Sequence, residues 1–248
     1  MLKRISRPSN IFRSQAVELG AKTFLIDEDT CATNFMIRDE KMMQLVSHDK
    51  EPITPLLHKV KSMYNDKSIS SIIVMGGSGD YFAVADSIIM MDCYECHDVT
   101  EKAKKIVASY SSNGTTEAVH SSFGEVTKRY PSLSSCAPVA GAKVSVRSKD
   151  VVSYGNTELV LSGLEQIVGL SQTNAISAAL QILASGIVCA NMIPTTEEVF
   201  KALDELIDQE GLHVLAAKQF DGALTRPRRF EIAGAMNRLR VDRMFSQK

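Results

Sequence analysis

The sequence of 248 residues lacks a long apolar run and a clear excess of charge of either sign. No apolar stretch approaches the roughly 18 to 20 residues that a membrane-spanning helix requires, which argues against a transporter subunit embedded in a bilayer. The formal net charge is only −1, so a protein that coats nucleic acid with its whole surface is not expected, although a local basic patch is compatible with this value. With 44% apolar and 23% charged residues, the composition is that of a globular protein with one or two domains.

A disulfide pattern and a secretory apolar segment are also missing. The five cysteines are odd in number and irregularly spaced, which favours reduced thiols inside a cell and a cytoplasmic location. The start of the chain carries Lys3, Arg4, Arg7 and Arg13 with no acid before Glu18. This pattern is compatible with an organelle presequence, but a start inside a longer gene is the interpretation that we favour, for a reason given below.

Short apolar runs alternate with helix-like stretches in the first half of the chain. The runs at 22–27, 71–75 and 87–91 are predicted to be buried parallel strands, and 100–110 to be an amphipathic helix. Strands separated by helix-length segments are typical of a parallel α/β sheet with flanking helices. The methionine pairs Met42-Met43 and Met90-Met91 are expected to fill the core.

The second half of the chain has a different character. A serine-rich stretch with two prolines is predicted to be a linker, residues 142–152 a β-hairpin, and most of the remainder helical. The expected helices span 161–170, 173–189 and 195–209, the last capped by Thr195 or Thr196. We therefore expect four segments: an irregular segment at 1–15, an α/β domain at 16–110, a linker at 111–140 and a mostly helical region at 141–248.

The most informative short string is residues 23–30, Thr-Phe-Leu-Ile-Asp-Glu-Asp-Thr. An apolar strand that ends in Asp27-Glu28 places carboxylates at the carboxyl edge of a sheet, where α/β proteins bind ligands. Phosphoryl transfer uses such a pair, because one carboxylate holds Mg²⁺ and the other orients or deprotonates the attacking water. A strand that runs into an acidic turn is the alternative, and this string alone does not decide between them.

Longer strings add a specific resemblance. L-I-D-E-D-T-C-A-T-N-F-M-I-R-D from Leu25, E-P-I-T-P from Glu51 and G-G-S-G-D-Y-F-A-V-A-D from Gly76 resemble the predicted ABC-class ATPase family, which is distinct from the transporters. The likeness covers most of the chain from about residue 16. It implies a partial P-loop-type parallel sheet followed by a mostly helical carboxyl-terminal region, and ATP and Mg²⁺ as ligands.

The resemblance also implies residue roles. Asp27 is the Walker B aspartate of the Mg²⁺ shell, and Glu28 is the residue that activates water. The D-loop, which faces a second nucleotide-binding half, and the switch region contain the remaining candidates: Asp29, Thr30, Asn34, Gly76, Gly77, Ser78 and Asp80. ABC-class domains usually have a histidine at the end of the switch strand, where this chain has Gly76-Gly77, as does the resembling family.

The motif G-x-x-x-x-G-K-[ST] does not occur in the 248 residues. This loop supplies the backbone N–H groups and the lysine that surround the nucleotide phosphates. The glycine-rich string 76–79 has no lysine and is followed by Asp80, whose charge would repel phosphate. We therefore expect the chain alone to bind ATP weakly and to hydrolyse it poorly. The missing loop is also the reason to favour a start inside a longer gene, so that the chain is the carboxyl-terminal part of a longer ATPase or a degenerate copy. The partners to expect are a missing amino-terminal half or a second nucleotide-binding half.

Cys93-Tyr-Glu-Cys96-His97 has the C-x-x-C-H spacing of covalent haem attachment. That chemistry requires export, for which the sequence has no signal, and no second cysteine pair has the spacing of a structural zinc site. We expect neither haem nor zinc.

The end of the chain is locally basic, with arginines at positions 226, 228, 229, 238 and 240. Arg226, Arg228, Arg229, Arg238 and Arg240 are candidates for contacts with phosphate or nucleic acid, which would make the chain a non-catalytic nucleic-acid-binding or interaction module. The structural alternative is that they form ion pairs with the acidic helix at 195–210. An RNA affinity that falls steeply with salt and is lost in Arg238→Glu would favour the first.

Overall fold

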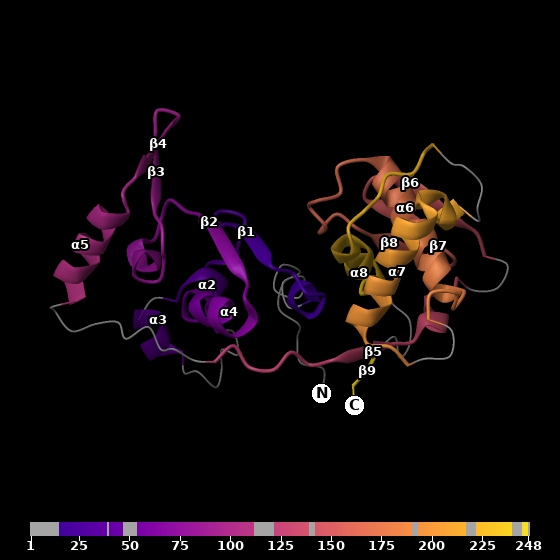
Figure 1. Cartoon of the computed structure of the whole chain (residues 1–248), viewed down its shortest axis with the longest axis horizontal. Helices are drawn as coiled ribbons and strands as arrows, with labels where there is room; N and C mark the ends of the chain where they lie inside the picture. Colours follow the sequence, from indigo (N-terminus) through magenta and orange to yellow (C-terminus); the bar gives the residue numbers. More distant parts are fainter. Residues whose placement is uncertain are drawn as a thin grey trace. The chain divides into compact units, whose positions relative to one another are not determined.

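The computed structural model describes residues 15–38, 40–46, 54–111, 122–138, 142–189, 193–216, 222–239 and 245–247. The chain forms two compact units (Figure 1). The β1–β2 unit is Lys22–Glu125, and the helical unit is Met1–Ala21 together with Val126–Lys248. Residues 1–14, which make up most of the predicted irregular segment, and Arg240 lie outside the described residues. Within the described part, no helix is long and apolar enough to cross a membrane.

The β1–β2 unit is built on a pair of parallel strands, β1 (Thr23–Asp27) and β2 (Ser70–Val74). Their register places Asp27 beside Val74, and the pairing continues one residue further because Glu28 N donates to Val74 O at 3.0 Å. Parallel strands at 22–27 and 71–75 are therefore confirmed. Between these strands the described residues form four short helical elements: α2 (Thr33–Met36), α3 (Glu40–Leu45), η1 (Leu56–His58) and α4 (Val60–Lys67).

Only one face of this sheet is buried. Ile26 is 3% exposed, whereas Leu25, Ile72 and Val74 are 78%, 60% and 66% exposed. The expectation that both strands are buried on both faces is therefore wrong for these three residues. Apolar residues on both faces of a strand usually indicate burial on both faces. Here α4 packs on β2 from one side, and no described residue covers the other side, so Leu25, Ile72 and Val74 stay exposed.

The apolar run at 87–91 does not extend the parallel sheet. After the 3₁₀ turn η2 (Gly79–Ala83), β3 (Ile89–Asp92) and β4 (Glu95–Asp98) pair antiparallel in a hairpin, which projects away from β1 and β2 (Figure 1). The prediction of a third parallel strand is wrong. Helix α5 (Thr100–Ser111) follows and confirms the helix predicted at 100–110.

The turn between β3 and β4 explains why the sequence pattern did not indicate a hairpin here. Cys93 and Tyr94 have φ values of 47° and 67°, the left-handed conformation that a two-residue hairpin turn requires and that Asn-Gly sequences usually provide. The side chains of Met90 and Met91 are consequently exposed rather than in the core, and Met42 is also largely exposed. The expected core role is wrong for these three methionines, because each lies on a surface that no described element covers.

The helical unit contains a three-stranded antiparallel sheet formed by β6 (Val144–Ser148), β7 (Val151–Tyr154) and β8 (Thr157–Val160). The predicted hairpin at 142–152 is thereby confirmed. Ordered elements also lie inside the stretch predicted to be a linker: η3 (Leu133–Cys136) and β5 (Arg129–Pro131), which pairs with β9 (Phe245–Gln247). The chain here is thus part of the folded unit.

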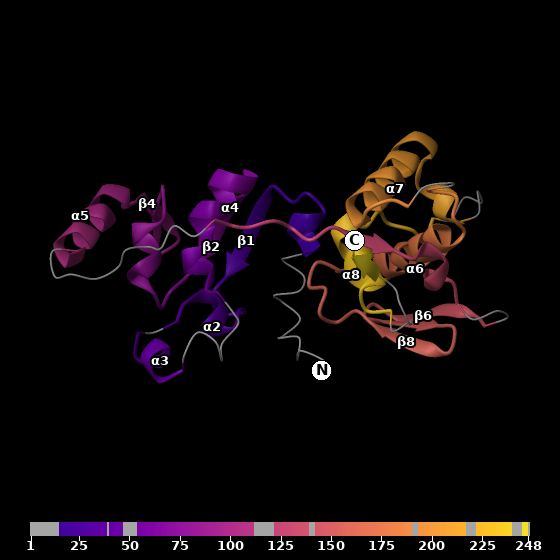
Figure 2. The same ribbon diagram turned by 90° about the horizontal axis from the view of Figure 1, so that it is seen from below.

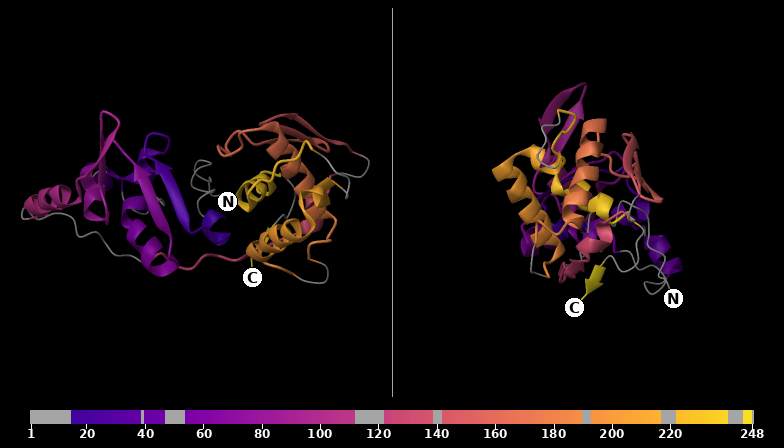
Figure 3. Two further views of the ribbon diagram at one scale, coloured as in Figure 1. Left: turned by 45° about the horizontal axis from the view of Figure 1, so that its top comes forward. Right: turned by 90° about the vertical axis from the view of Figure 1, so that its right-hand side faces the viewer.

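Three helices gather on one side of the β6–β7–β8 sheet (Figures 2 and 3). They are α6 (Leu170–Ala184), α7 (Thr196–Glu210) and α8 (Arg229–Met236), with the 3₁₀ turn η4 (Leu212–Ala216) after α7. The helix predicted at 161–170 is wrong, since residues 161–169 form turns and Gly169 is the N-cap of α6. Glycine at 163 and 169 disfavours a continuous helix, each by about 1 kcal/mol.

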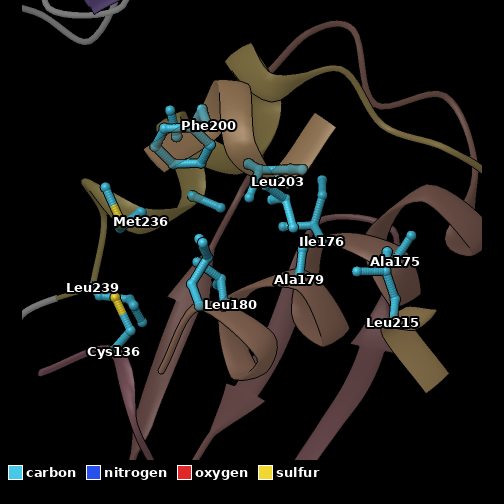
Figure 4. Packing of buried hydrophobic residues seen from close by; sticks show 14 of the residues in the cluster. Cys136, Ala175, Ile176, Ala179, Leu180, Phe200, Leu203, Leu215, Met236 and Leu239 are labelled. Carbon is cyan, nitrogen blue, oxygen red and sulfur yellow. The ribbon is translucent and has the colours of Figure 1, made fainter. Parts of the chain in front are cut away.

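The core of the helical unit lies where these helices meet (Figure 4). Ile176, Ala179 and Leu180 of α6 face Phe200 and Leu203 of α7, and all five are buried. The spacing of the α6 residues, one turn apart, is the reason that one side of this helix is continuously apolar.

Cys136 belongs to this core and lies near β7. It is fully buried, its carbonyl oxygen accepts from the Tyr154 hydroxyl at 2.8 Å, and burial raises the pKa of its thiol to about 12. Desolvation also raises the pKa of Tyr154. Both groups therefore stay neutral in the folded protein at physiological pH.

A capping box starts α7. Thr195 Oγ1 accepts from Glu198 N at 3.3 Å, and Glu198 Oε2 accepts from Thr195 N at 2.7 Å. Thr195 is thus the N-cap, one of the two residues predicted for this position. The backbone hydrogen bond from Thr195, followed by its hydroxyl hydrogen bond, lowers the pKa of Glu198 below its ordinary value of 4.5.

Thr195→Ala is expected to lower the free energy of unfolding by about 1 kcal/mol, because it removes the cap of α7. Since the pKa of Glu198 is lower in the folded state, its contribution is present above pH 4.5 and is lost as the pH falls through the folded-state value. The variant keeps the backbone donor to Glu198 but loses the hydroxyl donor, so the difference from the wild-type protein in urea titrations should shrink by the hydroxyl part between neutral pH and about pH 3. Glu205→Gln, an exposed change on the same helix, serves as the control. An equal loss at both pH values would contradict the role of Glu198.

Candidate functional site

The carboxyl end of β1 carries the two carboxylates singled out by the sequence. Asp27 is exposed and Glu28 half-buried. The chain then turns, with Asp29 N donating to Asp27 Oδ1 at 3.2 Å and the Thr30 hydroxyl donating to Asp27 O at 3.1 Å. The acidic turn and the carboxylates at the sheet edge are therefore features of the same segment.

The Glu28 carboxylate is held by the loop that follows β2. Its Oε2 accepts from Gly76 N and from Gly77 N, both at 3.1 Å. Residues 48 and 49 positions apart meet because parallel strands end at the same edge of a sheet. Two consecutive backbone N–H groups that converge on one oxygen form an anion-binding concavity, which here fixes one of the two oxygens of Glu28.

The second oxygen of Glu28 lies beside Gly77. A Cβ placed on Gly77 would be 3.4 Å from Glu28 Oε1, while one on Gly76 would meet nothing within 4 Å. Neither glycine has a left-handed φ, so alanine is compatible with the backbone at both positions. These neighbouring residues therefore form a matched pair for testing access to Oε1.

The other D-loop and switch candidates follow Glu28 or Gly77 within a few residues of the sequence. Asn34 is exposed in α2, and Ser78 accepts from Asp80 N at 3.4 Å with its own hydroxyl directed at Asp80 Oδ2 at 3.3 Å. Ser78 thereby caps η2. The Asp80 carboxylate is exposed, so it adds negative charge to the loop that follows β2.

The residues at β1 fit a magnesium ion that is shared with a nucleotide. Mg²⁺ in phosphoryl-transfer sites is bound by one or two carboxylates together with substrate phosphates and water. Asp27 is an exposed carboxylate with a hydroxyl, Thr30, in the adjoining turn. Across the described residues no three His, Cys, Asp or Glu side chains form a group that could hold a metal ion by themselves.

The candidate arginines that the structure describes belong to the helical unit and are engaged within it. Arg226 pairs with Asp208 and, at 3.4 Å, with Asp204, which also lies 3.6 Å from Arg229. The hydrogen bond to Arg226 lowers the pKa of Asp208. These pairs connect the arginines to the acidic helix α7, as the structural interpretation of the tail predicts.

Two further arginines have other local partners. Arg228 binds Glu231, whose carboxylate is almost fully buried, through Nη2 to Oε1 at 2.7 Å. Arg238 donates to Gly234 O at 2.8 Å, and desolvation lowers its pKa. Helix α8 itself is largely buried over residues 231–236. The helix packs against α6 and α7, which removes its sides from water.

The C-x-x-C-H string lies on the β3–β4 hairpin. Cys93, Cys96 and His97 are all exposed, and His97 Nε2 lies 3.8 Å from Glu95 Oε2. The string thus belongs to a surface hairpin rather than to the sheet.

Sequence reasoning named Glu28, Gly76 and Gly77 but missed their contact with one another. The shared carboxyl edge of parallel strands was a signal for it. The ion pair between Glu18 and Arg129, which joins residues 111 positions apart, had no local signal.

Two family models match the chain. The P-loop domain of the ABC_ATPase family matches residues 6–129, half of the chain, and the MRB1590 C-terminal domain matches residues 143–244. No curated protein matches significantly. The first match contains β1, β2 and the Glu28 contact, and the second contains the β6–β7–β8 sheet and helices α6 to α8.

Proposed function

Since the chain belongs to the ABC_ATPase P-loop domain family, we propose that the β1–β2 unit is the Walker B part of a site that binds and hydrolyses ATP. The observation that carries this proposal is the position of Glu28: its carboxylate ends a parallel strand and is held by the N–H groups of Gly76 and Gly77. A carboxylate fixed at this edge is where the attacking water of a phosphoryl transfer is oriented.

Glu28 is the proposed general base. Because both loop N–H groups bind Oε2, Oε1 remains as the acceptor for a water proton. Hydrogen bonds to Oε2 hold the side chain in one orientation and so reduce the reorganisation needed for proton transfer. Asp29, Thr30 and Asn34 form the proposed D-loop, and Ser78 and Asp80 complete the proposed switch loop.

Asp27 is the proposed ligand of the magnesium ion, directly or through water. When bound, Mg²⁺ neutralises charge on the phosphates and polarises the transferred phosphoryl group. Asp27 Oδ1 accepts from Asp29 N, which fixes the carboxylate toward the turn and leaves its other oxygen for the ion.

The phosphate-binding loop is proposed to come from a separate P-loop-bearing half of an ABC-class domain, because the chain has no G-x-x-x-x-G-K-[ST] motif. Each charge-assisted hydrogen bond that such a loop makes to phosphate contributes about 1.5 to 3 kcal/mol. The absence of two or three weakens binding by several orders of magnitude. The chain alone is therefore expected to bind Mg-ATP only weakly, and we call its complex with such a half the assembled ATPase.

The metal role of Asp27 is tested on the chain alone with Mn²⁺ and ATP. The wild-type protein at high concentration should enhance the water proton relaxation of Mn-ATP, and Asp27→Asn should lose most of this enhancement because a carboxylate ligand is removed. Asp92→Asn, which removes an exposed carboxylate on the hairpin, is the matched control. Equal enhancement by the wild-type protein and Asp27→Asn would show that Asp27 is not a ligand of the metal ion.

Gly77→Ala is expected to lower hydrolysis by the assembled ATPase by about ten- to a hundredfold, because its methyl group would contact Glu28 Oε1 and displace the water. Gly76→Ala, whose methyl group meets nothing within 4 Å, should stay close to wild type. Single-turnover hydrolysis measures both. If the two variants behave alike, Oε1 is not the side of Glu28 that acts on water.

A further inference from the structure

The register of the β3–β4 hairpin places its sulfur and imidazole side chains in two pairs, one on each face. Met91 lies opposite Cys96, and Met90 lies opposite His97. Successive residues of a strand point to opposite faces, while directly paired residues share one. One face of the hairpin therefore carries a thioether beside a thiol, and the other carries a thioether beside an imidazole.

The two sulfurs on the first face touch. Cys96 Sγ donates to Met91 Sδ at 3.2 Å, although both side chains are exposed, Met91 by 63%. Burial does not force this contact, since water reaches both residues. The hairpin backbone instead holds two soft donor atoms at a separation that one ion can bridge after a small adjustment.

The donor set is selective. Thiolate and thioether ligands favour Cu(I), whereas Mg²⁺ and Ca²⁺ require oxygen ligands. A structural zinc ion needs four ligands of the thiolate or imidazole type, and the described residues contain no group of three His, Cys, Asp or Glu that could begin such a set. A monovalent soft ion that accepts few ligands is the species that fits.

We propose that Met91 and Cys96 form a surface binding site for Cu(I). The Cys96 thiol loses its proton to solvent, its thiolate forms the first bond to the ion, and the Met91 thioether forms the second. Copper stays monovalent, so each ion bound releases one proton and no electron is transferred. The site depends only on β3 and β4 and is independent of the proposed ATPase site.

The full-length chain is titrated under anaerobic conditions with Cu(I) held by the chromophoric chelator bicinchoninate. The wild-type protein should withdraw copper from the chelator, with one equivalent lost in Cys96→Ser. Met91→Leu, which keeps the volume but removes the donor atom, should weaken that equivalent by at least tenfold. Native mass spectrometry of the same samples counts the bound ions.

Two variants on the same hairpin are the matched controls. Met90→Leu changes the methionine of the opposite face, and Cys93→Ser changes the cysteine of the turn; both should retain the equivalent. The proposal is overturned if the wild-type protein withdraws no copper, if Cys96→Ser or Met91→Leu binds as the wild type does, or if Cys93→Ser alone abolishes the equivalent. Because all four side chains are exposed, these substitutions leave the fold intact, which circular dichroism verifies.

Discussion

Arg129→Ala is expected to lower the free energy of unfolding of the helical unit by about 3 to 5 kcal/mol, the cost of removing one partner from a desolvated ion pair. Arg129 Nε donates to Glu18 Oε2 at 2.9 Å, and the Glu18 side chain is only 9% exposed. The same guanidinium donates through Nη1 to Asn237 Oδ1 at 2.8 Å and lies over the Phe245 ring at 4.3 Å. The alanine variant leaves both acceptors without this donor and the ring without its cation.

Urea titration followed by far-ultraviolet circular dichroism measures this change, since α6 and α7 dominate the signal of the helical unit. Arg147→Ala, an exposed arginine on β6, is the control and should shift stability by no more than about 0.5 kcal/mol. Arg129→Lys should recover only part of the loss, because lysine keeps the charge but not the planar fork. An Arg129→Ala protein as stable as the control would refute the importance of this pair.

Glu28→Gln is expected to reduce ATP hydrolysis by the assembled ATPase by about a hundredfold to ten-thousandfold, the range in which a general base contributes. Glutamine can still accept the hydrogen bonds from Gly76 N and Gly77 N through its carbonyl oxygen, but it cannot take a proton from water. The loop should therefore stay in place while the chemical step slows.

Single-turnover hydrolysis of radiolabelled ATP measures this step, and nucleotide affinity in the same samples shows that binding is retained. Glu158→Gln, an exposed glutamate on β8, is the matched control in the other unit. The chain alone should show negligible turnover. Robust turnover by the chain alone that Glu28→Gln abolishes would overturn the proposal that a separate phosphate-binding half is needed, while leaving the role of Glu28 intact.

Elements with strong local signals were predictable from the sequence. The start of α7 follows from Thr195 and Glu198, which lie three residues apart and satisfy each other's polar groups. Strands β1 and β2 follow from short apolar runs, Phe-Leu-Ile in the first and Ile-Ile-Val in the second. The cap of α7 is made within a few residues of the chain, so a pattern in the sequence contains it. The apolar runs likewise mark each strand locally, although the pairing of β1 with β2 joins residues 47 positions apart.

The hairpin was not predictable in the same way. An apolar run such as 87–91 is compatible with a parallel strand and with one arm of a hairpin. Cys93 and Tyr94 form a left-handed turn, although such turns usually contain Asn or Gly. The contact between Met91 and Cys96 forms only because of that turn. The sequence shows the C-x-x-C-H spacing but not this contact.

The amino-acid sequence by itself determined the α/β character of the first half, the position of Asp27 and Glu28 at the end of a strand, and the composition of the loop at Gly76 and Gly77. The tertiary structure alone decided that Glu28 meets that loop, that Arg226 and Arg229 bind acids of α7, and that one face of β1 and β2 stays open. The physical reason is distance along the chain. Propensity and capping act over a few residues, whereas hydrogen bonds and burial between distant segments exist only once the backbone has brought them together.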